Sequence, residues 1–553
     1  MSAGAWAPAA SAWLALPRPV PRRWLVFALL ALALLARQPR DLLHPQFNAE
    51  EGSIIFQQAY NQGPWRSLFV PASGYLHLTL RLAGALALLV PLELAPLVFK
   101  VLAVGVQMVP VAYLLADGVP GFAVAPAFRV AGAAAVLAGP NSQEVYLNLN
   151  NSQWFLTLAG CLILLAGPRP GKWRRALDTG VILLFATTGP FVIACAPLAL
   201  WSLWRCRARG VRTWTPLIAL AGAAVQLALL ATGPRATSAT AGFGIPTVAE
   251  IVRILGLDGA ANAFFGLNFV AARHSGFPAG AVLAAAAAVP ALGLAAVALR
   301  NLALLVLLGL ATVAAAVPFL FPLNDPRHWL SPAFGPRYFF FTMLFVVCTL
   351  LAMAERGGTW RALAVPGLAA VLLLGVRGDY RIPPAMDTHW HDQVAAFRSL
   401  PPGTDFFIPV YPQVSAWGMT LRRTSQPAAA DPLAGHKASG APLRAAVEFV
   451  GTTLPPDSTS PDQKVIVRGY AADAGSRSAA GVFLNIDGRL FPAVTGMTPE
   501  ATQADPSLAG AGFARYVPRD ALGAGAHELQ VLALDHAGTS LLAPGPTRRF
   551  TLP

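Results

Sequence analysis

The sequence predicts a polytopic α-helical membrane protein of about eleven spans, followed by a C-terminal β-sandwich domain outside the cytoplasm. Hydrophobic residues make up 55% of the 553-residue chain, and charged residues make up only 12%. Soluble globular chains carry about 25% charged residues, so most side chains here are expected to face lipid or other membrane helices. After Arg377 the apolar runs become short and alternate with Gly, Pro, Asp and Ser, a pattern typical of strands.

Membrane spans are expected where apolar stretches reach about 17–25 residues, because that length crosses the hydrocarbon core of a bilayer. The first stretch is interpreted as a signal anchor, since no clear small-residue cleavage site follows it. The expected spans cover residues 23–38, 94–115, 121–140, 151–167, 175–189, 190–204, 215–232, 278–298, 302–321, 336–354 and 361–376.

Basic residues gather in short loops between the apolar runs, for example at residues 169–175 and 205–209. Such loops stay cytoplasmic, so the N-terminus is expected in the cytoplasm and the C-terminal domain in the periplasm. This parity requires residues 72–92 to form an amphipathic or re-entrant helix on the outer face instead of a full crossing. Because membrane orientation explains the net charge of +14, no nucleic acid is expected as a partner.

The chain is expected to form three parts: a membrane domain at residues 1–376, an α/β connecting segment at 377–435 and the β-sandwich at 436–553. The connecting segment should contain a helix near 392–400 and a strand near 406–410. In the last part, Asp487-Gly488 predicts a hairpin turn. The expected strands are 444–450, 464–470, 482–486, 513–517 and 528–534.

Cysteine and histidine spacing predicts neither disulfides nor a metal site. No cysteine lies in the last third of the chain, so an exported domain there needs no disulfide. The run His389-Trp390-His391-Asp392 is interpreted as the start of a helix near the membrane interface, and no zinc-binding spacing is present. The four cysteines are Cys161, Cys195, Cys206 and Cys348.

An acidic pair, Glu50 and Glu51, follows the first span directly and should lie at the outer membrane face. Carboxylates near lipid cost desolvation free energy, so they are usually retained for a function. One of them can act as a general base toward an acceptor hydroxyl, especially if the neighbouring acid or burial raises its pKa. The alternative is a structural role at the start of a helix, where acidic residues are favoured.

The second external loop, at residues 141–154, is rich in amides and ends on an indole. Amides offer donors and acceptors to sugar hydroxyls, and tryptophan adds a flat face. The alternative is an interfacial tryptophan with helix-capping asparagines. Its polar or aromatic side chains include Glu144, Asn148, Asn150, Asn151, Gln153 and Trp154.

Arg337 lies at the outer end of the tenth expected span, within Gly335-Pro336-Arg337-Tyr338. An arginine at this place can hold a phosphate group through paired hydrogen bonds. The alternative is that its side chain reaches to lipid headgroups.

Three further features each leave two interpretations open. Lys100 and Arg129 lie within expected spans and either reach to the interface or face the bundle interior. Residues 187–191 break a hydrophobic stretch, as a turn in the membrane or as a helix kink. Residues 248–276, which include Asp258 and Asn262, form either an interfacial amphipathic helix or a gate for a lipid-linked substrate.

Taken together, these motifs resemble the GT-C superfamily of membrane glycosyltransferases that use polyprenyl-phosphate-linked sugars. The resemblance covers about residues 20–376, and the tail is similar to carbohydrate-binding sandwiches attached to some bacterial members. Many members have an aspartate in the first loop where this chain has two glutamates. The matching motifs are Ala49-Glu50-Glu51-Gly52, Gly74-Tyr75-Leu76-His77-Leu78, residues 141–154, Thr188-Gly189-Pro190-Phe191 and Gly335-Pro336-Arg337-Tyr338.

The resemblance implies an inverting sugar transfer at the outer face of a bacterial inner membrane. The donor would be a polyprenyl-phosphate sugar, the acceptor a glycan or glycoprotein, and no other cofactor is implied. Glu51 or Glu50 would be the base, and Arg337 with Tyr338 would bind the donor phosphate. The implied substrate-binding residues are Tyr75, His77, Glu144, Asn148, Asn151, Gln153 and Trp154.

Two rival functions belong to other classes. A transporter or flippase for a lipid-linked glycan would need polar residues at the bilayer midplane, often with broken helices. A non-catalytic envelope-glycan assembly protein would need neither the acidic pair nor Arg337. The candidate residues gather at the expected outer face, which favours the transferase.

Overall fold

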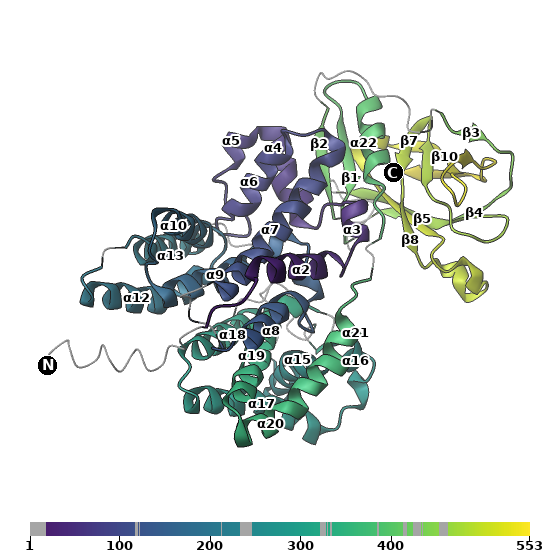
Figure 1. Cartoon of the computed structure of the whole chain (residues 1–553). Coiled ribbons are helices and arrows are strands. Elements are labelled where there is room, and N and C mark those ends of the chain that lie inside the picture. The colour runs from purple at the N-terminus through teal and green to yellow at the C-terminus, as the bar shows by residue number, and fades with distance from the viewer. Residues whose placement is uncertain are drawn as a thin grey trace. The chain divides into compact units, whose positions relative to one another are not determined.

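The structure is a computed structural model that describes residues 18–552 with internal gaps. The chain, shown in Figure 1, divides into two compact units. Unit 1 comprises Met1–Pro39, Phe69–Thr79 and Lys100–Pro383, and unit 2 comprises Arg40–Leu68, Leu80–Phe99 and Pro384–Pro553. The gaps are residues 117–119, 121, 212, 233–245, 321–327, 329, 332–333, 384–385, 413–416, 424–432, 434 and 453–462.

Most of the described chain is helical, and 7 helices are long and apolar enough to cross a membrane. By their length and composition, these helices suggest a membrane-embedded protein. They are α7 (Ala95–Leu115, preceded by the turn Leu92–Leu94), α9 (Ser152–Ala166, preceded by Leu149–Asn151), α13 (Thr215–Thr232), α17 (Ala279–Ala298), α18 (Leu302–Leu320), α19 (Phe340–Arg356, preceded by η8, Pro336–Phe339) and α20 (Gly358–Ala370, continued through η9, Val371–Val376, and α21, Arg377–Asp379).

The other four expected spans contain shorter helices. Proline and glycine limit two of them: α8 begins at Pro126 and ends before Gly139, while α10 ends before Gly189-Pro190. Residues 188–190 therefore form a turn between two helices rather than a kink within one. The four helices are α2 (Arg23–Leu35), α8 (Pro126–Ala138), α10 (Lys172–Thr187) and α12 (Ala196–Ala208, preceded by α11, Phe191–Ala194).

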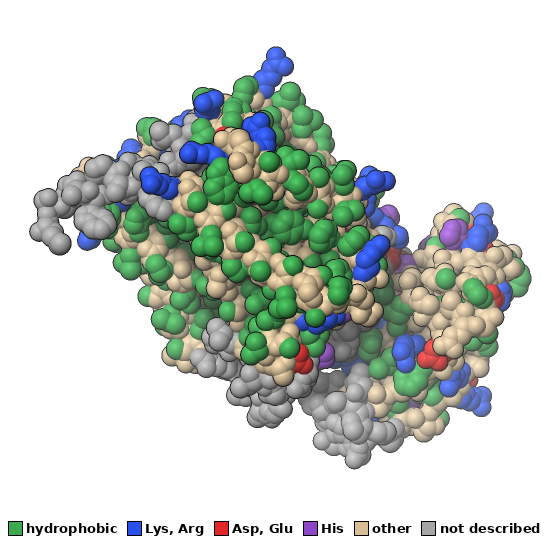
Figure 2. All heavy atoms as spheres, turned by 90° about the horizontal axis from the view of Figure 1, so that it is seen from below, with side chains coloured by type: hydrophobic (Ala, Val, Ile, Leu, Met, Phe, Trp, Pro, Cys, Tyr) green, Lys and Arg blue, Asp and Glu red, His purple; other side chains and the backbone are tan. Residues whose placement is uncertain are grey.

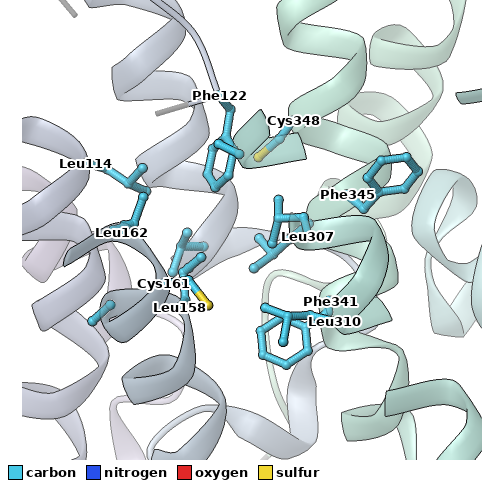
Figure 3. Close-up of a cluster of buried hydrophobic side chains, with 14 of the residues drawn as sticks. Leu114, Phe122, Leu158, Cys161, Leu162, Leu307, Leu310, Phe341, Phe345 and Cys348 are labelled. Atoms are coloured by element: carbon cyan, nitrogen blue, oxygen red, sulfur yellow. The ribbon is translucent and has the colours of Figure 1, made fainter. Parts of the chain in front are cut away.

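The core of unit 1 lies around α9 and α19. Figure 3 shows leucine, phenylalanine and cysteine side chains of α9, α18 and α19 packed together, with Leu114 of α7 beside them. The span containing α19 is 89% buried within the described part of the protein and that containing α9 is 83% buried, whereas the span that begins with α20 is only 17% buried. The two central helices therefore hold the short turns at their N-terminal ends in fixed positions.

The outer helices of unit 1 expose apolar side chains. Figure 2 shows a broad face covered largely by hydrophobic side chains, with lysines and arginines mostly near its margins. Leu294 of α17 and Leu363 of α20 are among the exposed leucines. Exposed apolar surface on this scale fits contact with lipid acyl chains.

Unit 2 contains the strand-rich C-terminal region, with two antiparallel four-stranded sheets. Their strand orders are β12-β10-β6-β7 and β4-β5-β9-β8. The turn between β6 and β7 places Asp487 and Gly488 at positive φ, as the predicted hairpin requires. The strands are β4 (Leu443–Thr452), β5 (Lys464–Asp473), β6 (Val482–Ile486), β7 (Arg489–Pro492), β8 (Val494–Met497), β9 (Gly512–Pro518), β10 (Gly525–Ala533) and β12 (Thr547–Leu552).

The five strands and the helix expected in this region are confirmed within one to three residues at their ends. The expected helix is α22 (Trp390–Ser399), and the expected strand after it is β1 (Asp405–Pro409), paired with β2 (Gly418–Arg422). Unit 2 also holds a helical part that begins with α3 (Arg40–Leu43). It continues through η1 (Glu51–Phe56), α4 (Gln57–Gln62) and α5 (Pro64–Ser67), and α6 (Leu78–Ala87) contributes from Leu80 on.

Candidate functional site

In unit 1, the polar segment at residues 139–151 connects α8 to α9 and is fixed by two side chains of α7. The Lys100 ammonium donates to the carbonyl oxygen of Leu147 at 3.0 Å, and the Gln107 amide donates to that of Val145 at 3.1 Å. Leu147 has a φ of 49°, a conformation that a leucine rarely adopts without external support. Lys100 and Arg129 are both buried, so of the two interpretations the bundle interior is confirmed.

The start of the same segment is held by a fully buried carboxylate, Asp379. It accepts hydrogen bonds from the backbone N–H groups of Asn141 at 2.8 Å, Leu267 at 2.6 Å and Asn268 at 3.1 Å. These three backbone donors meet the need of the buried carboxylate for hydrogen bonds. Asp379 therefore ties the segment to α16 (Leu267–Ala271).

Arg37 also braces this region, and its guanidinium donates to the backbone carbonyl oxygen of Asp379 at 3.1 Å. Its guanidinium donates to the carbonyl oxygen of Leu137 at 2.7 Å and lies 3.9 Å from the ring centroid of Tyr146. The Tyr146 hydroxyl in turn donates to the carbonyl oxygen of Val136 at 2.6 Å. These buried polar groups act on backbone, so they set the geometry of the segment that carries Glu144.

Glu144 and Arg337 form an ion pair between η3 (Gln143–Val145) and η8. One carboxylate oxygen accepts from the Arg337 guanidinium, and the other accepts from the Arg337 backbone N–H at 3.2 Å. The Arg337 side chain is 37% exposed and that of Glu144 is 28% exposed, so both remain accessible. Arg337 also lies 5.0 Å from the ring centroid of Tyr338.

The amides of residues 148–151 organise the beginning of α9. Both Asn148 and Asn151 donate from their side chains to the carbonyl oxygen of Glu144, and Asn151 accepts from the Trp154 indole at 3.1 Å. The Trp154 ring is only 1% exposed and packs edge-on against Tyr338. In this structure Trp154 is part of the core beneath the site, and its predicted contact with substrate stays a prediction.

A second strip of polar groups comes from residues 75–79 and 188–189. A His77 ring nitrogen lies 3.2 Å from the carbonyl oxygen of Asn150, and the Gly189 N–H donates to the carbonyl oxygen of Leu76 at 3.0 Å. Tyr75 is half-buried with its ring 6.1 Å from that of His77. Unit 1 thus brings four of the five predicted motifs together.

Gly189 is required at its position by space as well as by conformation. Its φ is 84°, and a Cβ placed there would lie 2.1 Å from the Gln153 side-chain oxygen. Gln153, half-buried on α9, therefore packs directly onto the turn after α10. This contact joins the amide segment to the Thr188-Gly189-Pro190-Phe191 motif.

The acidic pair belongs to unit 2, and its two residues differ in how deeply they are buried. Glu51 is fully buried, and its carboxylate accepts from the Asn48 backbone N–H at 2.9 Å, as a residue at a helix start does. Glu50 is half-buried. Glu51 begins η1, a π-helical turn of the kind that is frequent at functional sites.

The backbone around the pair packs tightly within unit 2. A Cβ on Gly52 would lie 2.7 Å from the Val410 side chain and 3.0 Å from that of Phe47. The Ala49 N–H donates to the carbonyl oxygen of Tyr411 at 2.5 Å. The acidic segment is therefore built on residues that follow β1.

Sequence reasoning placed Asp258 on an interfacial helix or gate, whereas both Asp258 and Asn262 are buried in unit 1. Asp258 lies in the π-helical turn η5 (Leu255–Ala261), and burial raises the pKa of its carboxyl well above the usual range. The Asn141 amide donates to the Asp258 carbonyl oxygen at 3.0 Å. Gly256 and Gly259 leave room for close packing there, a signal that helical periodicity alone does not reveal.

The run around His389 lines a small pocket of about 110 Å³ in unit 2, together with His44 and Asp387. The His389 ring donates to or accepts from the Thr495 hydroxyl at 2.6 Å, and α22 begins at Trp390, as expected. Within the part of the chain that the structure describes, no group of three acidic, histidine or cysteine side chains could hold a metal ion. All four cysteines are free thiols.

The comparisons with known proteins return no match: no family model, no curated protein and no solved structure matches the chain.

Proposed function

We propose that this chain is an inverting glycosyltransferase of the GT-C type, acting at the outer face of a bacterial inner membrane. It would move a sugar from a polyprenyl-phosphate donor to a glycan or glycoprotein acceptor. The proposal includes about eleven spans, a cytoplasmic N-terminus and a periplasmic carbohydrate-binding β-sandwich. The observation that carries it is Arg337: an accessible guanidinium and a backbone N–H at a helix start, beside a segment rich in amides.

In this mechanism Arg337 compensates negative charge on the donor phosphate. The acceptor oxygen attacks the anomeric carbon, and the bond from that carbon to the phosphate oxygen breaks with its electron pair left on the lipid phosphate. Charge grows on the phosphate as the bond breaks, so a fixed cation stabilises the transition state more than the ground state. The half-buried amides of Asn148 and Gln153 would hydrogen-bond sugar hydroxyls.

In the mechanism that the resemblance implies, the proton from the acceptor hydroxyl passes to a carboxylate of the acidic pair. Glu50 suits this role better than Glu51, because Glu51 is fully buried and accepts a backbone hydrogen bond at the start of η1. Glu50 is more accessible, and a base must reach the proton that it removes. Glu51 would then fix the backbone from which Glu50 projects.

Three buried ionisable residues of unit 1 favour an enzyme over a transporter. A transport path is lined by polar groups that face a cavity near the bilayer midplane. Lys100, Asp379 and Arg37 instead bond to backbone groups around one short segment. Such contacts hold the backbone of a site in place and do not line a path for a substrate.

The test uses a deletion strain complemented with the wild type, Glu50→Gln or Arg337→Ala. The sugars of the cell-envelope glycans are then quantified. Loss of one sugar in the deletion strain, restored by the wild type and by neither variant, supports the proposal. Proteoliposomes distinguish the rivals: sugar transfer without movement of the lipid across the bilayer is expected, and lipid movement without transfer would favour a flippase.

A further inference from the structure

The position that the donor phosphate would take on Arg337 is occupied by a side chain of the protein itself. Glu144 accepts from both the guanidinium and the backbone N–H of Arg337, so its two oxygens engage two donors of one residue. The oxygens of a phosphate group can accept from a guanidinium and from a backbone N–H at a helix start in the same way. Carboxylate and phosphate therefore compete for the same donors.

We propose that Glu144 is an internal substitute for the donor phosphate, and that the lipid phosphate binds by displacing the Glu144 carboxylate from Arg337. This inference rests on the proposed function, because it takes Arg337 as the phosphate-binding residue. It assigns Glu144 a role in selecting the donor by charge. A ligand must carry enough negative charge to replace the carboxylate.

Displacement requires only the Glu144 side chain to move. Its backbone carbonyl oxygen is held by the Asn151 amide at 2.9 Å. Three residues further along the chain, the carbonyl oxygen of Leu147 is held by Lys100. The carboxylate itself is 28% exposed, so it can turn toward solvent or headgroups. Because both side chains are partly exposed, the exchange needs no local unfolding.

The site left behind after displacement suits an anion. The Arg337 backbone N–H lies in η8, which leads into the 17-residue helix α19. The N-terminal end of a helix carries partial positive charge and favours phosphate groups. Gly335 at a φ of 65° allows the chain to turn into this end without a side chain in the way.

Unit 2 supplies a matched control. Arg398 and Glu93 also form an ion pair, with a second contact of 3.0 Å, and their side chains are 26% and 28% exposed. This pair resembles Glu144 and Arg337 in charge and exposure but is not assigned to the donor. Glu93→Gln therefore changes the net charge by the same amount as Glu144→Gln.

The experiment measures binding of a polyprenyl phosphate without sugar to the full-length protein in nanodiscs of zwitterionic lipid. Glu144→Gln should bind it roughly two- to fivefold more tightly than the wild type, the range that a partly exposed ion pair represents. Arg337→Ala should bind it about tenfold more weakly or worse, as expected for losing a hydrogen-bonded charge. Glu93→Gln should bind like the wild type, and the double variant E144Q/R337A like Arg337→Ala.

The outcomes separate the two proposals. If Arg337→Ala weakens binding but Glu144→Gln does not tighten it, the exchange is wrong and the phosphate role of Arg337 stands. If Arg337→Ala binds like the wild type, the phosphate role fails and the exchange fails with it. Equal tightening for phosphatidylglycerol would assign the site to lipid headgroups and overturn selection of the donor. Glutamine keeps a hydrogen-bond acceptor at position 144, and the thermal unfolding midpoint of each variant verifies folding.

Discussion

Lys100 and Leu147 are joined by a hydrogen bond from a buried ammonium group to a buried backbone carbonyl oxygen, 3.0 Å apart. The bond connects a membrane helix to the one leucine whose backbone turns left-handed in the segment between α8 and α9. A buried cation is costly unless its hydrogen-bonding groups are satisfied. The hydrogen bond to the Leu147 carbonyl oxygen satisfies part of this requirement and fixes the segment at that residue.

Replacement of Lys100 by methionine tests this interpretation. Methionine fills similar space but leaves the Leu147 carbonyl oxygen without this donor, at a cost of about 1–3 kcal/mol. We expect a lower thermal unfolding midpoint in detergent together with weaker binding of polyprenyl phosphate. Wild-type binding in a folded Lys100→Met variant would show that the segment keeps its position without the lysine.

Gly189→Ala should destabilise the protein. The left-handed backbone opposes a side chain, and the new Cβ would overlap the Gln153 side-chain oxygen. We expect a loss of roughly 1–3 kcal/mol in the free energy of unfolding. Gly180→Ala in the helix α10 is the control, since a Cβ there meets nothing within 4 Å and alanine favours helices. Equal unfolding midpoints for the two variants would contradict the packing described for Gly189.

Substitutions of the two acidic residues should have different effects, on stability at Glu51 and on activity at Glu50. Glu51→Ala removes the oxygen that accepts the Asn48 N–H, and it should lower the unfolding midpoint by the equivalent of about 1–3 kcal/mol. Glu50→Gln should leave the midpoint unchanged and reduce sugar transfer by at least about 100-fold, as expected when a general base is lost. A fully active Glu50→Gln enzyme would assign the base elsewhere.

Acid should weaken the turn between β6 and β7. The hydrogen bond from the Glu528 backbone N–H is the main cause that lowers the pKa of Asp487 below its usual range, and the hydrogen bond with the His527 side chain is the second. Because the folded-state pKa is depressed, this contribution is present above the unfolded-state pKa of about 4 and is lost as pH falls through the folded value. We expect Asp487→Asn to reduce the dependence of the unfolding midpoint on pH between about pH 5 and 2. An unchanged pH profile in that variant would exclude the contribution.

Local patterns predicted the strands and their turn well, because alternation and the Asp487-Gly488 pair act over a few residues. The acidic pair and Arg337 were singled out because charges near apolar runs are conspicuous in a sequence. Local patterns do not predict the partners of such charges, because these partners are far apart in the sequence. Glu144 and Arg337 lie 193 residues apart, and Arg37 contacts Asp379 342 residues away. Residues 248–276 predict an interfacial helix or a gate, because a long stretch with scattered charges has the same pattern on a surface and in a glycine-lined interior.

The membership of residues 40–68 in unit 2 bears on how this chain can change over evolution. Asn48, Ala49 and Gly52 contact Tyr411 and Val410, which lie more than 300 residues further along the chain. The region after Pro384 is therefore not a separate domain that could be lost or exchanged without affecting residues 40–68. A recombination that replaced this region would also remove the contacts that surround the two glutamates. The segment at residues 40–68 and the region after Pro384 are therefore expected to evolve together.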